Sequence, residues 1–223
     1  DPITQAGLNT VWGSQESANN VAVTQVLAPA QTIVVLAAGV ETINDNPANI
    51  TSVEGLGLTW NLRTSYRDPA SNTFQTAEIW WAVNENDTAV SGPVTVTYDN
   101  GFDDQTTTVA TFGQVNLQNP WANTAPVTGN TVNSSNRIEA TLNIAEKNTI
   151  GLAYFAIPNY GGDVQNGVSR PVGWNLIKEQ NNGGAEYWEY TTLSYQIFNS
   201  PQSYLTVVGD HAINPMISGS HGL

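Results

Sequence analysis

The chain has 223 residues, of which 40% are apolar, 9% are aromatic and only 11% are charged. Nineteen acidic against six basic residues give a net charge of −13, which repels phosphate backbones and anionic lipid surfaces and argues against nucleic-acid binding. The lack of cysteine excludes a disulfide framework and a thiolate metal site, and no apolar run approaches the ~18 residues of a membrane span.

The N-terminal segment, residues 1–27, is predicted to be extended. Residues 1–12 and 21–27 alternate weakly between apolar and polar side chains, and they share an ITQ/VTQ element. Two interpretations remain open: an edge strand folded back on its own domain, or an arm that adds itself to the sheet edge of a neighbouring copy. The candidate contact residues in this segment are apolar: Ile3, Leu8, Val11, Trp12, Val21 and Val23.

The next segments indicate core strands. Residues 32–41 are almost continuously apolar and are predicted to lie in the core of a sandwich. Residues 51–66 predict two strands joined by a bend at Gly55 and Gly57; no third glycine and no helix follow, so this is not a dinucleotide-binding fingerprint.

Residues 77–115 predict a three-stranded antiparallel meander, because turn-forming clusters separate three runs rich in β-branched and aromatic residues. Val94, Val96 and Tyr98 alternate with threonines, which is typical of a strand with one buried face. Successive residues of a strand face opposite sides, so only one of Trp80 and Trp81 is expected inside, and the other is a candidate for an interface.

Residues 118–136 form a long polar segment whose large apolar anchor is Trp121. Further strands are predicted at residues 138–144, where apolar and polar residues alternate cleanly, and at 150–157, 172–178, 185–198 and 202–209. No helical period is sustained. We therefore predict an all-β fold, a single antiparallel β-sandwich of about 10–12 strands over residues 28–215, preceded by the N-terminal arm and followed by a tail at residues 216–223.

The order of several segments resembles a broad group of jelly-roll or immunoglobulin-like β-sandwich modules from secreted bacterial surface proteins and phage structural proteins. The segments are TSVEGLGLTW, AEIWWAVN, SGPVTVTYD and VATFGQVNLQNPW. Similar modules have Tyr where this chain has Trp81, and Gln114 interrupts their F-x-G-V pattern. The resemblance covers roughly residues 28–215, rests on strand and turn residues, and implies a structural role.

Residues suited to catalysis are scarce. Histidine occurs only at positions 211 and 221, and there is no G-x-S-x-G motif, so a Ser-His-Asp triad is not expected. Glu78, Glu186 and Glu189 are the acids in aromatic-rich strands from which a pair of glycosidase carboxylates would have to come, but the favoured interpretation is that they are solvent-facing acids on strands. We expect no enzymatic activity.

Three other kinds of site remain open. Asp99, Asp103 and Asp104 supply the oxygen ligands that Ca²⁺ prefers, although Asx turns also account for them. Sequons for N-glycosylation occur at Asn49, Asn86 and Asn133. The exposed faces of Trp121 and Trp188 are candidates for stacking on sugar rings.

The sequence as a whole favours an extracellular structural subunit that binds copies of itself. Scarce charge, abundant Asn and Thr, and many strands whose edges need partners suit repeated subunit contacts in a surface filament or layer. A virion component, such as a capsid decoration or tail protein, and a carbohydrate-binding or adhesive module that binds glycans are the alternatives.

Overall fold

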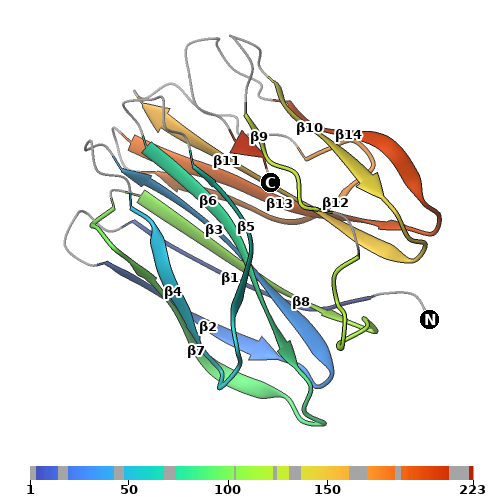
Figure 1. The fold of residues 1–223 in the computed structure, drawn as a ribbon. Coiled ribbons are helices and arrows are strands. Elements are labelled where there is room, and N and C mark those ends of the chain that lie inside the picture. Colours follow the sequence, from blue (N-terminus) through green and yellow to red (C-terminus); the bar gives the residue numbers. More distant parts are fainter. Residues whose placement is uncertain are drawn as a thin grey trace.

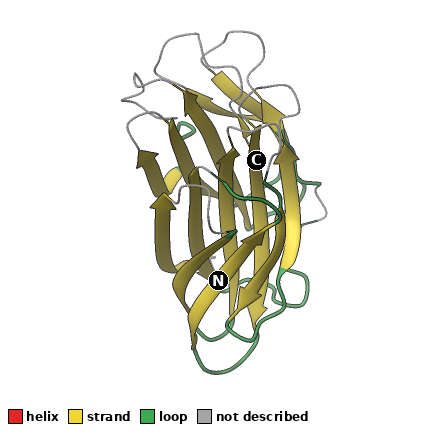
Figure 2. Ribbon diagram, turned by 90° about the vertical axis from the view of Figure 1, so that its left-hand side faces the viewer, coloured by secondary structure: helices red, strands yellow, loops and turns green. Residues whose placement is uncertain are grey.

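The chain folds entirely into strands wherever regular structure is described, as Figure 2 shows. The computed structural model describes residues 4–14, 20–42, 48–67, 74–102, 104–122, 125–130, 137–160, 170–183, 187–210 and 221–222. These ranges contain no helix, and therefore none long and apolar enough to cross a membrane. The all-β class predicted from the sequence is confirmed.

The strands pair into four antiparallel sheets. In spatial order, the β3 sheet consists of β1 (Thr4–Ser14), β8 (Asp104–Gly113), β3 (Thr32–Thr42), β6 (Phe74–Asn84) and β5 (Asn61–Arg67). The β7 sheet consists of β2 (Val21–Ala28), β7 (Val90–Tyr98) and β4 (Ile50–Gly55). The β11 sheet consists of β12 (Asn175–Gly183), β13 (Tyr187–Phe198), β11 (Thr149–Tyr160), β15 (His221–Gly222) and β9 (Gly129–Asn130). The β10–β14 sheet consists of β10 (Arg137–Ile144) and β14 (Gln202–Asp210).

The β3 sheet is buried on both faces, which explains why residues 32–41 are apolar without interruption. Val34 and Leu36 point into a core shared with the β7 sheet, whereas Ile33 and Val35 point into a second core shared with the β11 sheet. Leu36 is fully buried, and burying such a side chain contributes roughly 1.5–3 kcal/mol. The β3 sheet is thus a middle layer, as Figure 1 shows.

The β10–β14 sheet covers the opposite face of the β11 sheet. Ile138 and Val207 pack there against Phe155, Trp174 and Phe198 in a third core. The four sheets therefore stack in the order β7 sheet, β3 sheet, β11 sheet and β10–β14 sheet (Figure 1).

All strand pairs described lie within one of two sequence-contiguous halves. Strands β1 to β8 pair only with one another, and so do strands β9 to β15. The two halves meet through side chains of the β3 and β11 sheets, and the chain passes between them after residue 113. The molecule is therefore a stack of two sandwiches. The described residues form fifteen strands, two of them only two residues long, where about ten to twelve were expected.

The stacking of the sheets contradicts the prediction made for Trp80 and Trp81. Trp80 packs against the core between the β3 and β7 sheets, and Trp81 packs against the core between the β3 and β11 sheets. The expectation that only one of the two lies inside was wrong, because it assumed a sheet with one buried face. Trp174, which comes just before β12, is also buried and is only 5% exposed.

The N-terminal segment pairs within its own chain. β1 lies antiparallel to β8, and β2 lies antiparallel to β7, with Val21 opposite Thr97. Alternate residues of β2, among them Ala22 and Val26, are buried in the first core. Residues 21–28 are thus an integral edge strand. Exchange of the first residues with a neighbour stays a prediction.

Candidate functional site: a pocket between the two halves

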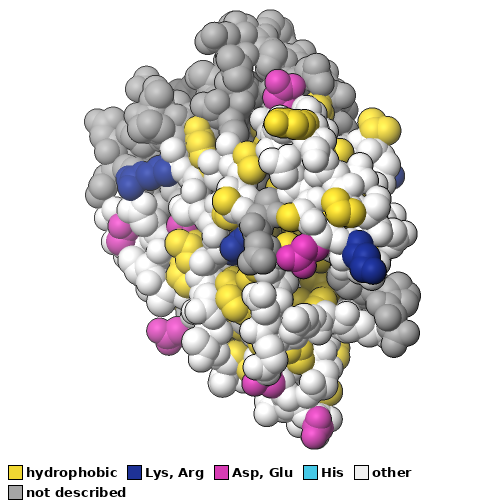
Figure 3. Space-filling view, turned by 45° about the vertical axis from the view of Figure 1, so that its right-hand side comes forward, with side chains coloured by type: hydrophobic (Ala, Val, Ile, Leu, Met, Phe, Trp, Pro, Cys, Tyr) yellow, Lys and Arg dark blue, Asp and Glu magenta, His cyan; other side chains and the backbone are white. Residues whose placement is uncertain are grey.

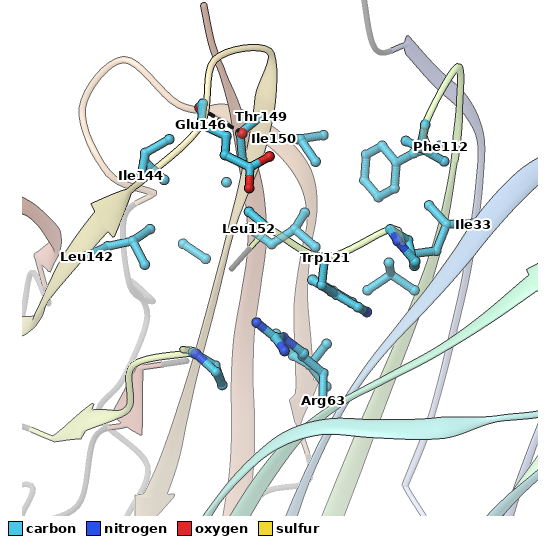
Figure 4. Close-up of a pocket in the computed structure, with 18 of the residues that line it drawn as sticks. Ile33, Arg63, Phe112, Trp121, Leu142, Ile144, Glu146, Thr149, Ile150 and Leu152 are labelled. Carbon is cyan, nitrogen blue, oxygen red and sulfur yellow. Dashed lines mark hydrogen bonds between the residues drawn. The ribbon is translucent and has the colours of Figure 1, made fainter. Parts of the chain in front are cut away.

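A cavity of about 340 Å³ lies where the two halves meet, beneath the segment that connects them. One wall comes from the β3 sheet and includes Ile33 and Phe112, and the opposite wall comes from β10 and β11 and includes Leu142 and Leu152 (Figure 4). The connecting segment closes one side through Trp121. Most of the surface is aliphatic or aromatic, and the volume falls at the lower end of the range usual for ligand pockets.

Trp121 is fixed by rings and charges of the first half. Its ring lies edge-on to Trp81, with centroids 5.9 Å apart, and the guanidinium carbon of Arg63 lies 4.7 Å from its centroid. The turn just before it is held by Asn116, whose side-chain oxygen accepts hydrogen bonds from the amides of Gln118 and Asn119. The indole Nε1–H is buried and has no hydrogen-bond acceptor among the described residues.

Charged side chains stand at two places in the pocket wall. Arg63 of β5 is half-buried, and burial lowers the pKa of its guanidinium below the ordinary value. Glu146 belongs to the turn between β10 and β11, where Thr149 donates a hydrogen bond of 2.9 Å to its carbonyl oxygen. Figure 4 shows Arg63 and Glu146 on opposite sides, with Leu152 between them. The described lining thus combines an apolar interior with Arg63 at one place and the neighbouring Glu146 and Lys147 at the other.

A second acid, Glu78, is buried inside the first sandwich and is only 5% exposed. Trp80 Nε1 donates a 2.6 Å hydrogen bond to one carboxylate oxygen, and Ser65 Oγ donates a 3.0 Å bond to the other. Burial raises the pKa of Glu78, and the two hydrogen bonds only partly oppose this rise. Glu78 therefore lies in a core and not in the pocket.

The predicted calcium ligands are described only in part. Both carboxylate oxygens of Asp99 accept hydrogen bonds of 2.7 Å from Asn49, one from its amide and one from its side chain. Burial alone raises the pKa of Asp99, but these bonds, its own amide bond and the charge of Arg67 outweigh it, so that the pKa is lowered. Asp103 and the side chain of Asp104 lie outside the described residues, within which no three His, Cys, Asp or Glu form a group. Calcium binding stays a prediction.

Two of the three sequons lie in described turns. Asn49 is half-buried, and its side-chain nitrogen, the atom that would carry a glycan, donates to Asp99. Asn86 is exposed, and its side-chain nitrogen donates to Asn84 Oδ1 at 2.9 Å. Asn133 lies outside the described residues. Asn86 is therefore the more accessible of the two described acceptors.

The other candidate contact residues divide into three groups. Val21 and Val23 are 36% and 52% exposed on β2, as a contact strand requires. Leu8, Val11, Trp12 and Trp188 lie in strands whose side chains are not described, and Ile3, like Glu186, is outside the described residues. The ring of Trp121, a candidate for sugar stacking, contacts Arg63 and Trp81, and sugar binding stays a prediction.

Sequence reasoning missed Arg63, Glu146 and the aliphatic walls of the pocket. Arg63 and Glu146 are 83 residues apart in the sequence (146 minus 63), and the pocket exists because two halves stack. The one local signal was a lone tryptophan in a long polar segment.

Fold and site together define a class: an all-β protein of stacked antiparallel sheets with a small apolar pocket at the junction. Comparison of the chain with protein-family models, with curated proteins and with solved structures gave no match.

Proposed function

We propose that the protein is a non-enzymatic, extracellular structural subunit that assembles with copies of itself through β1 and β2. The observation that carries the proposal is the distribution of charge over the sheet edges. β1 and β2 are the two described edge strands longer than two residues that contain no charged residue. The two strands also lie close to each other, where the β3 and β7 sheets come together.

The other long edge strands each carry charge, which is the usual protection of an edge against pairing with another chain. The charged residues are Glu54 in β4, Arg63 and Arg67 in β5, Lys178 and Glu179 in β12, Arg137 and Glu139 in β10, and Asp210 in β14. The sandwich formed by the β3 and β7 sheets therefore lacks charged edge residues on the side where β1 and β2 lie. A strand edge of this kind favours β-augmentation by a second copy.

The outer surface of β2 supports the same contact. Val21, Val23 and Leu27 are each at least one-third exposed and alternate with buried residues. Figure 3 shows acidic and basic side chains scattered singly among uncharged polar and hydrophobic ones, in keeping with the 11% of charged residues. Charge repulsion between the edges of two copies is therefore small, even though each copy has a net charge of −13.

The test is a lysine placed on β2. Val23→Lys puts a charge on the exposed face of this edge, and the matched control Thr51→Lys puts the same charge on the exposed position of edge strand β4. Sedimentation velocity and negative-stain microscopy of the folded variants should show loss of assembly for Val23→Lys and wild-type assembly for Thr51→Lys. Unchanged assembly of Val23→Lys together with Gln25→Lys would refute the proposal.

This test is sharper than removing residues 1–27. That deletion would take Ala22 and Val26 out of the first core, so a loss of assembly could follow from unfolding alone. Microscopy of the native assembly also separates the two forms that the proposal allows, a surface filament or layer and a virion component.

A further inference from the structure

The geometry points to a ligand site in the pocket between the two halves: we propose that it binds a small apolar acid whose carboxylate meets Arg63 and Trp121. This proposal does not depend on self-assembly, because the pocket and the β1–β2 edge share no residue.

The walls define an apolar ligand. Side chains of two cores line the cavity, including Ile33 and Phe112 on one side and Leu142, Ile144 and Leu152 on the other. Such a surface gains free energy by removing apolar groups from water, at roughly 25 cal/mol per Å².

The polar groups in the pocket wall favour a ligand with an acidic group at one end. Trp121 Nε1–H is a buried donor with no acceptor among the described residues, and leaving a buried donor unsatisfied costs about 1–3 kcal/mol. The guanidinium carbon of Arg63 lies 4.7 Å from the centroid of the same ring, so a cation and the indole stand next to each other in the cavity wall. A carboxylate there can accept from both and be neutralised by Arg63.

Glu146 sets the orientation of the ligand. It stands across the pocket from Arg63, with Leu152 between them (Figure 4). Two carboxylates repel each other, and although Lys147 also lines the pocket next to Glu146, no acid of the described lining stands beside Arg63, so the acid end of the ligand lies at Arg63 and its apolar end lies toward β10.

Size excludes an extended peptide as the preferred occupant. Among the described residues, β11 pairs with β15 only at Phe155 and Ala156, so within this part of the chain no strand covers the edge of residues 149–153 next to the cavity. However, 340 Å³ is at the lower end of the range for ligand pockets, and five peptide residues have roughly three times as many non-hydrogen atoms as a ten-carbon acid.

The experiment is isothermal titration calorimetry with three probes that share a ten-carbon chain: decanoate, 1-decanol and decyltrimethylammonium. Decanoate is expected to bind at least tenfold more tightly than the cation, and the alcohol to lie between them. Equal affinities for decanoate and the cation, or no binding of decanoate, would overturn the proposal. So would tighter binding of an uncharged Val- and Thr-rich pentapeptide than of decanoate.

Variants locate the site. Arg63→Gln should weaken decanoate roughly tenfold or more while leaving 1-decanol unchanged, since a hydrogen bond to a charged group is worth about 1.5–3 kcal/mol. The matched control Arg67→Gln lies on the same strand but outside the pocket and should bind as the wild type does. Equal effects of the two variants would contradict the assignment.

A second pair covers the case in which Arg63→Gln does not fold. Trp121→Phe keeps the ring but removes the donor, and it should weaken decanoate several-fold without affecting 1-decanol. Its control is Trp60→Phe, because Trp60 Nε1 donates to the Gly55 carbonyl outside the pocket. Glu146→Gln should tighten decanoate binding. A weaker affinity for Glu146→Gln would mean that the ligand is reversed, which contradicts the proposal.

Discussion

The bend between β4 and β5 permits a quantitative test of the fold, because it carries the chain from the β7 sheet to the β3 sheet. Gly55 has φ of +140° and Gly57 has φ of +66°, and both conformations favour glycine. A Cβ atom on Gly55 would lie 2.2 Å from the Pro93 carbonyl oxygen and 2.8 Å from Val94 Cα, whereas a Cβ on Gly57 meets nothing within 4 Å. The two positions therefore differ in crowding by the backbone of β7.

The expected losses of unfolding free energy follow from this difference. Gly57→Ala has only the backbone cost, about 1–2 kcal/mol. Gly55→Ala adds overpacking to backbone strain, at about 1–3 kcal/mol each, so a loss of about 2–6 kcal/mol is expected. Urea unfolding followed by tryptophan fluorescence measures both, with near-ultraviolet circular dichroism as the check of the native state. Equal losses for the two variants would show that β4 and β7 are not paired as described.

Three further variants test individual contacts. Glu78→Gln should change the pH dependence of stability in urea titrations. The raised pKa of Glu78 stabilises the folded state fully below the ordinary value of 4.5, and this stabilisation is lost as pH rises through the folded pKa. The variant therefore gains stability relative to the wild type toward neutral pH. Asp99→Asn should show the opposite sign: the lowered pKa contributes stability above the ordinary value of 3.8 that is lost as pH falls, and at this largely exposed site the loss at neutral pH should stay below about 1 kcal/mol. Leu36→Ala in the middle sheet should lower the free energy of unfolding by about 2–5 kcal/mol, against under ~1 kcal/mol for its control Leu27→Ala, which is 51% exposed; similar losses would contradict the layer order.

Local patterns predicted the strands well. Val94 and Val96 are fully buried while Thr95 and Thr97 are half-buried, as their alternation indicated. Ile138 and Ile144 are likewise buried at the two ends of β10. These outcomes depend only on the two-residue period of a strand, which a sequence displays directly.

The number of layers was not predictable from the same patterns. A continuous apolar run such as residues 32–41 is compatible with any strand buried on both faces, and nothing in it tells what covers each face. The sequence pattern also gave no sign that Glu78 is buried, because the hydrogen bond from Trp80 that accompanies its burial forms only in the folded core. The pocket follows from the stacking of the halves, so Arg63 and Glu146 carried no local signal.

Hydrogen exchange monitored by mass spectrometry, on dilute monomer and on the assembled protein, tests the central claim most directly. Amides that enter a new strand pair exchange more slowly, and the experiment reports them segment by segment. Self-assembly through the uncharged edges predicts new protection in β1 and β2 and none in the charged edge strands β4 and β5. Protection that appears in β4 and β5 while β1 and β2 stay unchanged would contradict the account.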